Sequence, residues 1–213
     1  MMSSRRIVVP MMALIALLAV PVAPAAVAGP PTDQLRTQID RVVKLLEDQG
    51  LKRDGREVER RKAVRKIAED IFDFSETARR ALARHWQART PAEREEFTGL
   101  FADLLERSYL SKIELFNGEK ITYAGDAVEG DQATVRTKII TRQGSEIPVD
   151  YRLLQKSDKW LVYDVVIEGV SLIANYRTQF NKIIQTSSYQ DLVKKMKTKQ
   201  EEFLEQEKQK RTS

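Results

Sequence analysis

Apolar residues recur at helical spacing through the first part of the chain. They line one face of a predicted helix that Thr32 would cap and that carries Leu35 in its first turns. A second helix is expected from about Arg56, and a third, capped by Ser75, is expected to run through Trp86. This part of the molecule is therefore predicted to be helical.

The clearest helix start lies at residues 90–93, which read Thr-Pro-Ala-Glu. Threonine followed three positions later by glutamate has the spacing of a capping box, and proline is favoured at the first helical position. Asn117 and Gly118 are expected to end this helix. Its apolar face is formed by Phe97, Leu100, Phe101, Leu104, Leu105, Tyr109 and Ile113.

From Lys120 onward the apolar period changes from helical to alternating, which is typical of strands. Turns at 142–145 and 157–159 separate the alternating runs, and links this short join antiparallel neighbours. About four strands are expected, the last over 160–167. The residues expected to share the inner face are Val135, Ile139, Val149, Tyr151, Leu153, Val162 and Val166.

Gly169 interrupts the chain after the last strand. Two further helices are predicted, one over 172–185 with Ser171 as its cap and one from Tyr189 onward. No internal repeat or low-complexity linker divides the chain. The expected fold is a single α+β domain, in which a layer of helices packs on a curled antiparallel sheet. Residues 198–213, rich in Lys, Glu and Gln, are expected to form a charged helical tail.

The first 28 residues have the features of a secretory signal peptide. Arg5 and Arg6 form a basic segment, residues 7–20 form an apolar one, and the Ala-Val-Ala at 26–28 matches the small-residue pattern before a cleavage site. The apolar run is short for a membrane span and several prolines follow it at once, so cleavage is favoured over anchoring. We expect an exported domain over residues 29–197, followed by the tail.

The composition argues against several classes of chemistry. The chain has no cysteine and one histidine, which removes disulfides, thiol catalysis and the common zinc sites, and it lacks the glycine-rich loop that binds ATP. Loss of Arg5 and Arg6 would lower the formal net charge from +5 to +3, and no basic stripe interleaved with aromatic residues indicates nucleic-acid binding. We expect no catalytic residues, no metal and no cofactor.

Carboxylates and arginines are the remaining polar candidates. Asp70 and Asp73, like Asp164 and Glu168, are close in sequence, and paired carboxylates can act as acid and base when burial raises one pKa. Charge pairing with the abundant arginines is the favoured interpretation. Arg177 is expected either to pair with one of the last two carboxylates or to meet a phosphate headgroup.

With these elements in place, the chain resembles the MlaC or toluene-tolerance family, the periplasmic phospholipid-binding component of the Mla lipid-asymmetry pathway. The resemblance rests on Asp-Phe at 73–74, on Ala-Leu-Ala-Arg-His-Trp at 81–86, on the aromatic face of the 91–116 helix and above all on residues 160–180. It extends over nearly all of the mature chain. Ala83 stands where a glycine is expected.

The resemblance implies a carrier that moves phospholipid between an outer-membrane lipoprotein–porin complex and an inner-membrane ABC transporter, and so maintains outer-membrane lipid asymmetry. Both acyl chains would enter an apolar cavity between sheet and helices while the headgroup stays in water. A hopanoid is the alternative cargo, because a related branch is associated with such lipids. The alternatives from other classes are an enzyme with a buried carboxylate or histidine, and a solid-cored adaptor that bridges partners.

The residues expected to line that cavity come from the sheet and from two helices, 91–116 and 172–185. An ordinary filled core has the same pattern, and the export signal and the resemblance are what favour a cavity. Hinge-like motion between the sheet and either helix is expected to admit lipid, since a close-packed core would not. The set is Phe101, Leu105, Tyr109, Val135, Ile139, Val149, Tyr151, Val162, Val166, Ile173 and Tyr176.

Overall fold

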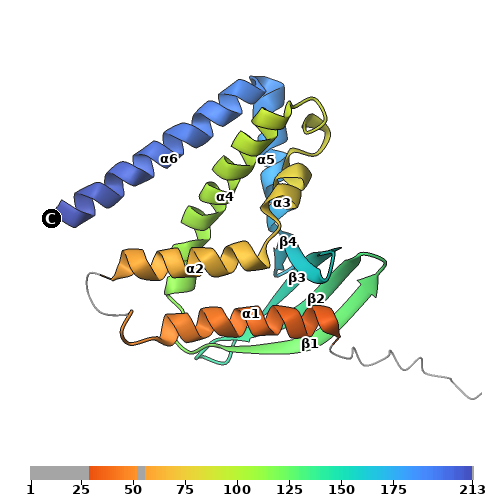
Figure 1. The fold of residues 1–213 in the computed structure, drawn as a ribbon, viewed down its shortest axis with the longest axis vertical. Coiled ribbons are helices and arrows are strands. Elements are labelled where there is room, and N and C mark those ends of the chain that lie inside the picture. The colour runs from red at the N-terminus through yellow and green to blue at the C-terminus, as the bar shows by residue number, and fades with distance from the viewer. Residues whose placement is uncertain (1–28, 52–55, 213) are drawn as a thin grey trace, which may run out of the picture.

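The computed structural model describes residues 29–51 and 56–212, so the predicted signal peptide lies outside the described residues. Within them, helices precede and follow a sheet, as the sequence predicts (Figure 1). The helices are α1 (Pro30–Glu47), α2 (Glu57–Ile71), α3 (Phe74–Leu82), a short 3-10 helix (Ala83–His85), α4 (Pro91–Glu114), α5 (Leu172–Thr186) and α6 (Tyr189–Thr212). The strands are β1 (Lys120–Glu129), β2 (Gln132–Ile140), β3 (Glu146–Lys156), β4 (Lys159–Ile167) and β5 (Val170–Ser171).

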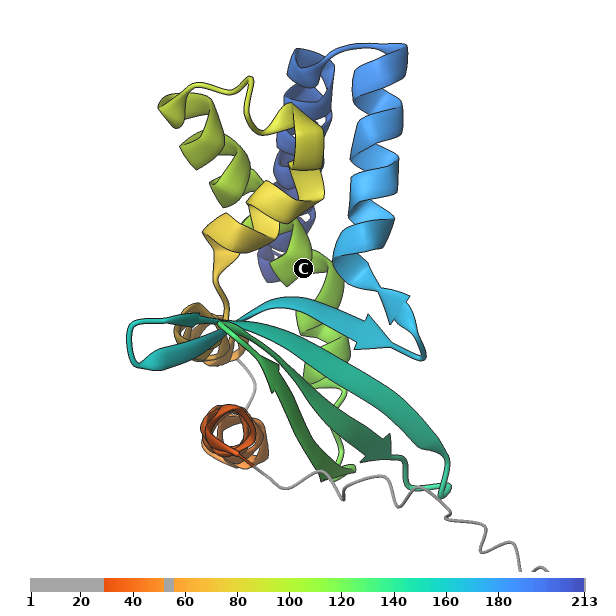
Figure 2. The ribbon, with the colours of Figure 1, turned by 90° about the vertical axis from the view of Figure 1, so that its right-hand side faces the viewer.

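The strands form one antiparallel sheet in the order β1-β2-β3-β4-β5. Each strand pairs with its neighbour in sequence, because the connections are too short for a crossover. The antiparallel prediction is therefore confirmed, with the two-residue strand β5 added to the four that were expected. The sheet is strongly curved (Figure 2).

Helices α1 and α2 lie across one face of this sheet (Figure 2). Gln34 fixes α1 to β4, because its side chain both donates to the Trp160 carbonyl at 2.9 Å and accepts from the Trp160 N–H at 3.0 Å. We call the buried residues between these helices and the sheet the sheet cluster. It consists of Leu35, Ile67, Ile71, Ala133, Val135, Leu153, Trp160 and Val162.

Helices α3 to α6 form a separate group that stands on β4 (Figures 1 and 2). Their core contains stacked and edge-to-face rings, among them Phe101 against Phe180 at 5.2 Å and Phe97 against Phe180 at 5.6 Å between centroids. We call these buried residues the helix cluster. It consists of Ala78, Ala81, Leu82, Trp86, Phe97, Leu100, Phe101, Ile173, Phe180, Tyr189, Leu192, Val193 and Met196. The apolar interior is thus divided into two main clusters.

Two helix starts match the prediction from local sequence. Thr90 accepts from the Glu93 N–H at 3.2 Å while the Glu93 carboxylate accepts from the Thr90 N–H at 2.8 Å, which completes the capping box. Ser171 caps α5 by accepting from the Ala174 N–H at 3.0 Å. Both caps use residues within one turn of the chain, which a sequence pattern can show.

Two other caps were predicted wrongly. α3 is capped by Asp73, whose carboxylate accepts from the Glu76 N–H at 3.0 Å, so the helix begins one residue before Ser75. α1 begins at Pro30, and Thr32 lies inside it. The Thr32 hydroxyl donates instead to Asp126 of β1 at 2.7 Å, a partner 94 residues away.

The third helix ends at Leu82, earlier than expected, because Ala83 adopts a positive φ of 47°. A non-glycine residue is strained in this region of conformational space, and glycine is not. The sequence expectation of a glycine at this position therefore has a structural reason. The chain continues through the 3-10 helix to Trp86, which belongs to the helix cluster.

Helix α6 continues without interruption past the predicted domain boundary at residue 197 and ends at Thr212. It leaves the helix group as a long arm (Figure 1). Leu204, near the end of this arm, is 43% exposed. In the described part of the chain, no helix combines the length and apolar character needed to cross a membrane.

Candidate functional site

The sheet face that α1 and α2 cover has a second half in which apolar side chains are only partly covered. Directly paired residues share a face, so Ile121, Ile139 and Ile147 form one row across β1, β2 and β3. Adjacent rows carry tyrosine, valine and a further isoleucine. We call this surface the apolar floor, formed by Ile121, Tyr123, Ile139, Ile147, Val149, Tyr151, Val165 and Ile167.

The two halves of the face differ in packing. Val135 and Ile139 lie four residues apart on the same face of β2, yet Val135 is 0% exposed within the sheet cluster whereas Ile139 is only partly buried. Val149 of the floor is buried, and Ile147 and Ile167 beside it are partly buried. The apolar floor is therefore less completely covered by the rest of the chain than the sheet cluster is.

The second half of α4 lies on the same side of the sheet as the apolar floor. Arg65 of α2 pairs with Glu106 of α4 at 3.2 Å, and Phe116, just after α4, packs against Leu46 and Val64 of α1 and α2. These contacts hold the end of α4 beside the two helices that cover the sheet. α4 is thus placed to form the wall that faces the floor.

Tyr109 on this part of α4 is linked to α5 by a side-chain hydrogen bond with Tyr176. Burial, with a smaller contribution from Tyr176, raises the pKa of Tyr109 to about 12. Its phenol therefore stays neutral at physiological pH. The hydrogen bond joins α4 to α5, the two helices that were predicted to border the cavity.

Tyr151 is partly buried and packs against the sheet cluster. Burial raises its pKa to about 12, so its phenol is neutral at physiological pH.

The predicted cavity residues are divided between the two clusters. Phe101 and Ile173 are packed inside the helix cluster, with Leu105 and Tyr176 against it. Val135 and Val162 are packed inside the sheet cluster, with Tyr151 against it. Neither cluster includes Tyr109, Ile139 or Val149. Most members of the predicted set are therefore packed inside or against the two clusters.

The expectation that Val166 shares the inner face is wrong. A β-bulge lies opposite Arg152 and Leu153, where the register of β3 and β4 shifts by one residue. Val162 pairs with Leu153 on the covered face, but Val166 pairs with Asp150 on the opposite face. Sequence alternation along β4 could not show this shift, which also hid Val165 and Ile167 from the predicted set.

Three of the four acidic candidates, Asp70, Asp73 and Asp164, are held in ion pairs or caps. The buried Asp164 accepts from Arg152 at 3.1 Å, from the Ser171 hydroxyl at 2.7 Å and from the Ile173 N–H at 3.1 Å. Asp70 pairs with Arg41 at 3.1 Å. Charge pairing, favoured from the sequence over acid–base chemistry, describes these contacts.

Asp73 combines its capping role with an ion pair to Lys156 at the β3–β4 turn. Arg177 makes neither of its expected carboxylate pairs, because its Nε donates to the Arg80 carbonyl at 2.9 Å. This contact ties α5 to α3. In the described residues, no group of three or more His, Asp or Glu side chains is arranged to hold a metal ion.

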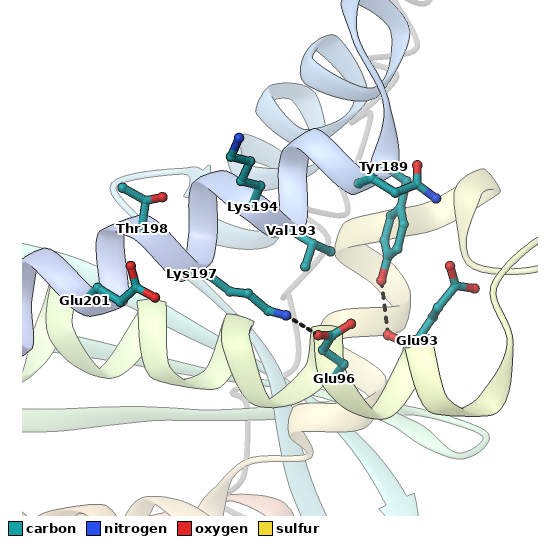
Figure 3. Close-up of a pocket in the computed structure, with 9 residues that line it drawn as sticks. Glu93, Glu96, Tyr189, Val193, Lys194, Lys197, Thr198 and Glu201 are labelled. Atoms are coloured by element: carbon teal, nitrogen blue, oxygen red, sulfur yellow. Dashed lines mark hydrogen bonds and ion pairs between the residues drawn. The ribbon is translucent and has the colours of Figure 1, made fainter.

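A groove of about 450 Å³ lies between α4 and α6 (Figure 3). Lys197 points across it to Glu96 at 2.6 Å, and the Tyr189 hydroxyl donates to the Glu93 carbonyl at 3.1 Å. Its lining is completed by the charged Lys194 and Glu201 and by the neutral Gln190, Val193 and Thr198. Acyl chains require mainly apolar walls, so this groove is a poor match for lipid and the apolar floor is the better candidate.

Comparisons with known proteins identify the family of this chain. The family model described as MlaC protein matches residues 36–198. A solved structure of a phospholipid-binding protein from Ralstonia solanacearum, in complex with a phospholipid, is similar with a TM-score of 0.69 and 25% identity, covering 78% of this chain and 94% of that one.

Two curated proteins are also similar to the chain. The intermembrane phospholipid transport system binding protein MlaC of Haemophilus influenzae is 25% identical over 122 residues, which are 55% of this chain and 57% of that protein. The toluene tolerance protein ttg2D of Pseudomonas putida is 28% identical over 97 residues, 45% of each chain. The chain thus spans about half the length of the curated relatives it matches.

Proposed function

Because the chain belongs to the MlaC family, we propose that it is a carrier that holds a phospholipid by its acyl chains in the hollow between the apolar floor and α4. The observation that carries this proposal is the apolar floor, in which Ile139 and Ile147 are only partly buried although they share a sheet face with the packed Val135. The similarity to a structure solved with a phospholipid supports the same cargo. A solid-cored adaptor would not need such a space.

Transfer energetics explain why a carrier is needed. Burial of a methylene group contributes about 0.8 kcal/mol. Transfer of two acyl chains with roughly 28 methylenes from a membrane to water therefore costs about 20 kcal/mol. An apolar hollow recovers most of this. Transfer between a bilayer and the protein is then close to balance, and partners rather than this chain would set its direction.

We extend the proposal to the cellular role. The carrier would work in the periplasm after removal of the signal peptide, between an outer-membrane lipoprotein–porin complex and an inner-membrane ABC transporter, to maintain the lipid asymmetry of the outer membrane. The names of relatives as a phospholipid transport protein and a toluene tolerance protein support this assignment. Loss of asymmetry would make a cell sensitive to solvents.

A vesicle assay tests the carrier function. Purified protein is incubated with donor vesicles that contain a fluorescent phospholipid, separated from them, and then added to unlabelled acceptor vesicles. The proposal predicts that labelled lipid leaves the donors with the protein at about one molecule per chain and appears in the acceptors. An adaptor without a lipid site would leave the label in the donors.

A further inference from the structure

The surface shared by α3, the 3-10 helix and α5 is strongly basic. α3 and α5 lie side by side in the group of helices that stands on β4 (Figures 1 and 2). Residues 77–92 and 169–190, which include most of α3 and all of α5, contain no Asp or Glu. We call the basic side chains along this seam the arginine patch. It consists of Arg79, Arg80, Arg84 and Arg177.

Two of these arginines bridge the helices through neutral partners. The Nε of Arg177 donates to the Arg80 carbonyl at 2.9 Å, and the Nη2 of Arg84 donates to the Asn181 side-chain oxygen at 2.7 Å. Arg80 and Arg84 are four residues apart, as are Arg177 and Asn181, so each pair lies on one side of its segment. A carbonyl and an amide hold a guanidinium in place without cancelling its charge. Both charges therefore remain available at an exposed surface.

The other two arginines share a single carboxylate. Arg79 donates to Glu76 from Nε and Nη2, both at 2.6 Å, and the Nε of Arg80 donates to Glu76 at 2.6 Å. The Arg80 guanidinium also lies 3.7 Å from the centre of the Tyr163 ring, which orients it further. Four arginines with one buried carboxylate leave the patch with a formal net charge of +3. The patch is thus a fixed positive surface, and internal ion pairing does not neutralise it.

The chemistry of the patch selects a class of partner. A guanidinium presents parallel N–H groups that match the two oxygens of a carboxylate. A surface that enters a bilayer also needs exposed apolar side chains. In the described part of the chain, the exposed large apolar residues lie on α2, β1, β5 and α6 and at the end of α4, and none lies on α3, the 3-10 helix or α5. Carboxylates on another protein match this surface better than a lipid bilayer does.

We propose that the arginine patch is a docking surface for a protein segment rich in Asp and Glu. Contacts of this kind speed association and are weakened by salt, which suits a complex that must form and separate repeatedly. The proposal rests on the proposed carrier function, because a carrier has to dock where its lipid is loaded and unloaded. It adds to that function the surface and the chemistry of the partner.

Binding of an acidic peptide tests the assignment. The probe is a fluorescein-labelled peptide of alternating Asp and Ser, with a Ser-Asn peptide as the neutral reference, and fluorescence anisotropy gives the dissociation constants at low salt. The double variant Arg84→Gln/Arg177→Gln removes the two arginines with neutral partners. The matched control, Lys194→Gln/Lys195→Gln, removes two exposed charges from α6. The first pair of changes is expected to weaken peptide binding by about tenfold and the control by less than about twofold.

A second variant leaves every bridging contact in place. Ala174 is an exposed residue three positions after the cap Ser171, where glutamate is favoured in a helix start. It also lies three residues before Arg177, so Ala174→Glu brings a carboxylate to the same side of α5. This variant is expected to fold as wild type does and to weaken peptide binding by about fivefold, because its carboxylate competes with the peptide and repels it. Thermal unfolding checks that each variant is folded.

The proposal is overturned if wild type binds the acidic peptide no better than the neutral one. Equal losses in the arginine and lysine double variants also overturn it, because binding would then follow overall charge and not the patch. Binding of wild type to phosphatidylglycerol vesicles but not to the peptide would replace the protein partner by a membrane surface. Bound lipid, measured by native mass spectrometry, is expected to be the same in wild type and Ala174→Glu. Absence of lipid from both would overturn the carrier function, whereas the anisotropy result tests the patch by itself.

Discussion

The proposed hollow above the apolar floor can be tested by filling it. Val135 and Ile139 share one face of β2, but Val135 is 0% exposed and pairs with Tyr151, whereas Ile139 is partly buried and outside both clusters. A tryptophan at Val135 must push aside packed neighbours. A tryptophan at Ile139 finds room in the hollow, where its indole takes the place of lipid.

The two changes should differ clearly in stability. Overpacking a filled core costs about 1–3 kcal/mol, and a ring added at a fully buried valine lies at the upper end of that range. For a chain of this size, about 3 kcal/mol lowers the melting temperature by roughly 6–12 °C. The free energy of unfolding of Ile139→Trp should stay within about 0.5 kcal/mol of the wild-type value, which corresponds to a change in melting temperature of less than about 2 °C.

The effect on lipid should be the reverse. An indole in the hollow excludes about four methylene groups, and at about 0.8 kcal/mol for each the bound lipid is weakened by roughly 3 kcal/mol, or about a hundredfold. Melting followed by circular dichroism and lipid content followed by mass spectrometry measure both effects on the same samples. The reasoning is refuted if Ile139→Trp melts as early as Val135→Trp, or if it retains as much lipid as wild type.

Three further changes test other parts of the account. Ala83→Gly should raise stability by about 1 kcal/mol, because Ala83 has a φ of 47°, and an unchanged melting temperature would contradict the strain. Burial would raise the pKa of Glu76, but hydrogen bonds from Arg79 and Arg80 outweigh burial and lower this pKa below 4.5. The ionised carboxylate therefore stabilises the fold above pH 4.5, and this stabilisation is lost as the pH falls through the pKa of the folded state. Glu76→Gln should remove this pH dependence of stability, which amounts to about 1 kcal/mol or less because both arginines are partly exposed. The prediction is refuted if the free energy of unfolding of Glu76→Gln falls with decreasing pH as it does in wild type. Val149→Glu should cost several kcal/mol and abolish lipid retention, whereas Val128→Glu, at a position 50% exposed on β1, should do neither.

Local patterns predicted much of this fold. The capping box at Thr90, the cap at Ser171 and the hairpin order of the strands depend on residues within a few positions of each other, and the structure confirms all three. Long-range partners could not be predicted in this way. Thr32 resembles a cap in sequence, but it binds Asp126, which only the fold brings near.

The candidate site was harder to predict for the same reason. Alternation placed Val149 and Tyr151 on one face correctly because β3 is regular on the side that faces β2. It placed Val166 on the wrong face because the bulge opposite Arg152 depends on how two strands pair. The unpaired Tyr123 hydroxyl could not be predicted either, because hydrogen-bond pairing is a property of the surroundings and the sequence shows only an aromatic residue in a strand.

Native mass spectrometry of freshly purified protein is the most direct test that the hollow shelters a lipid. We predict a population heavier than the bare polypeptide by the mass of one phospholipid, which is released on harsher activation and is depleted in Ile139→Trp. A single peak at the polypeptide mass, both after purification and after incubation with phospholipid vesicles, would contradict the account.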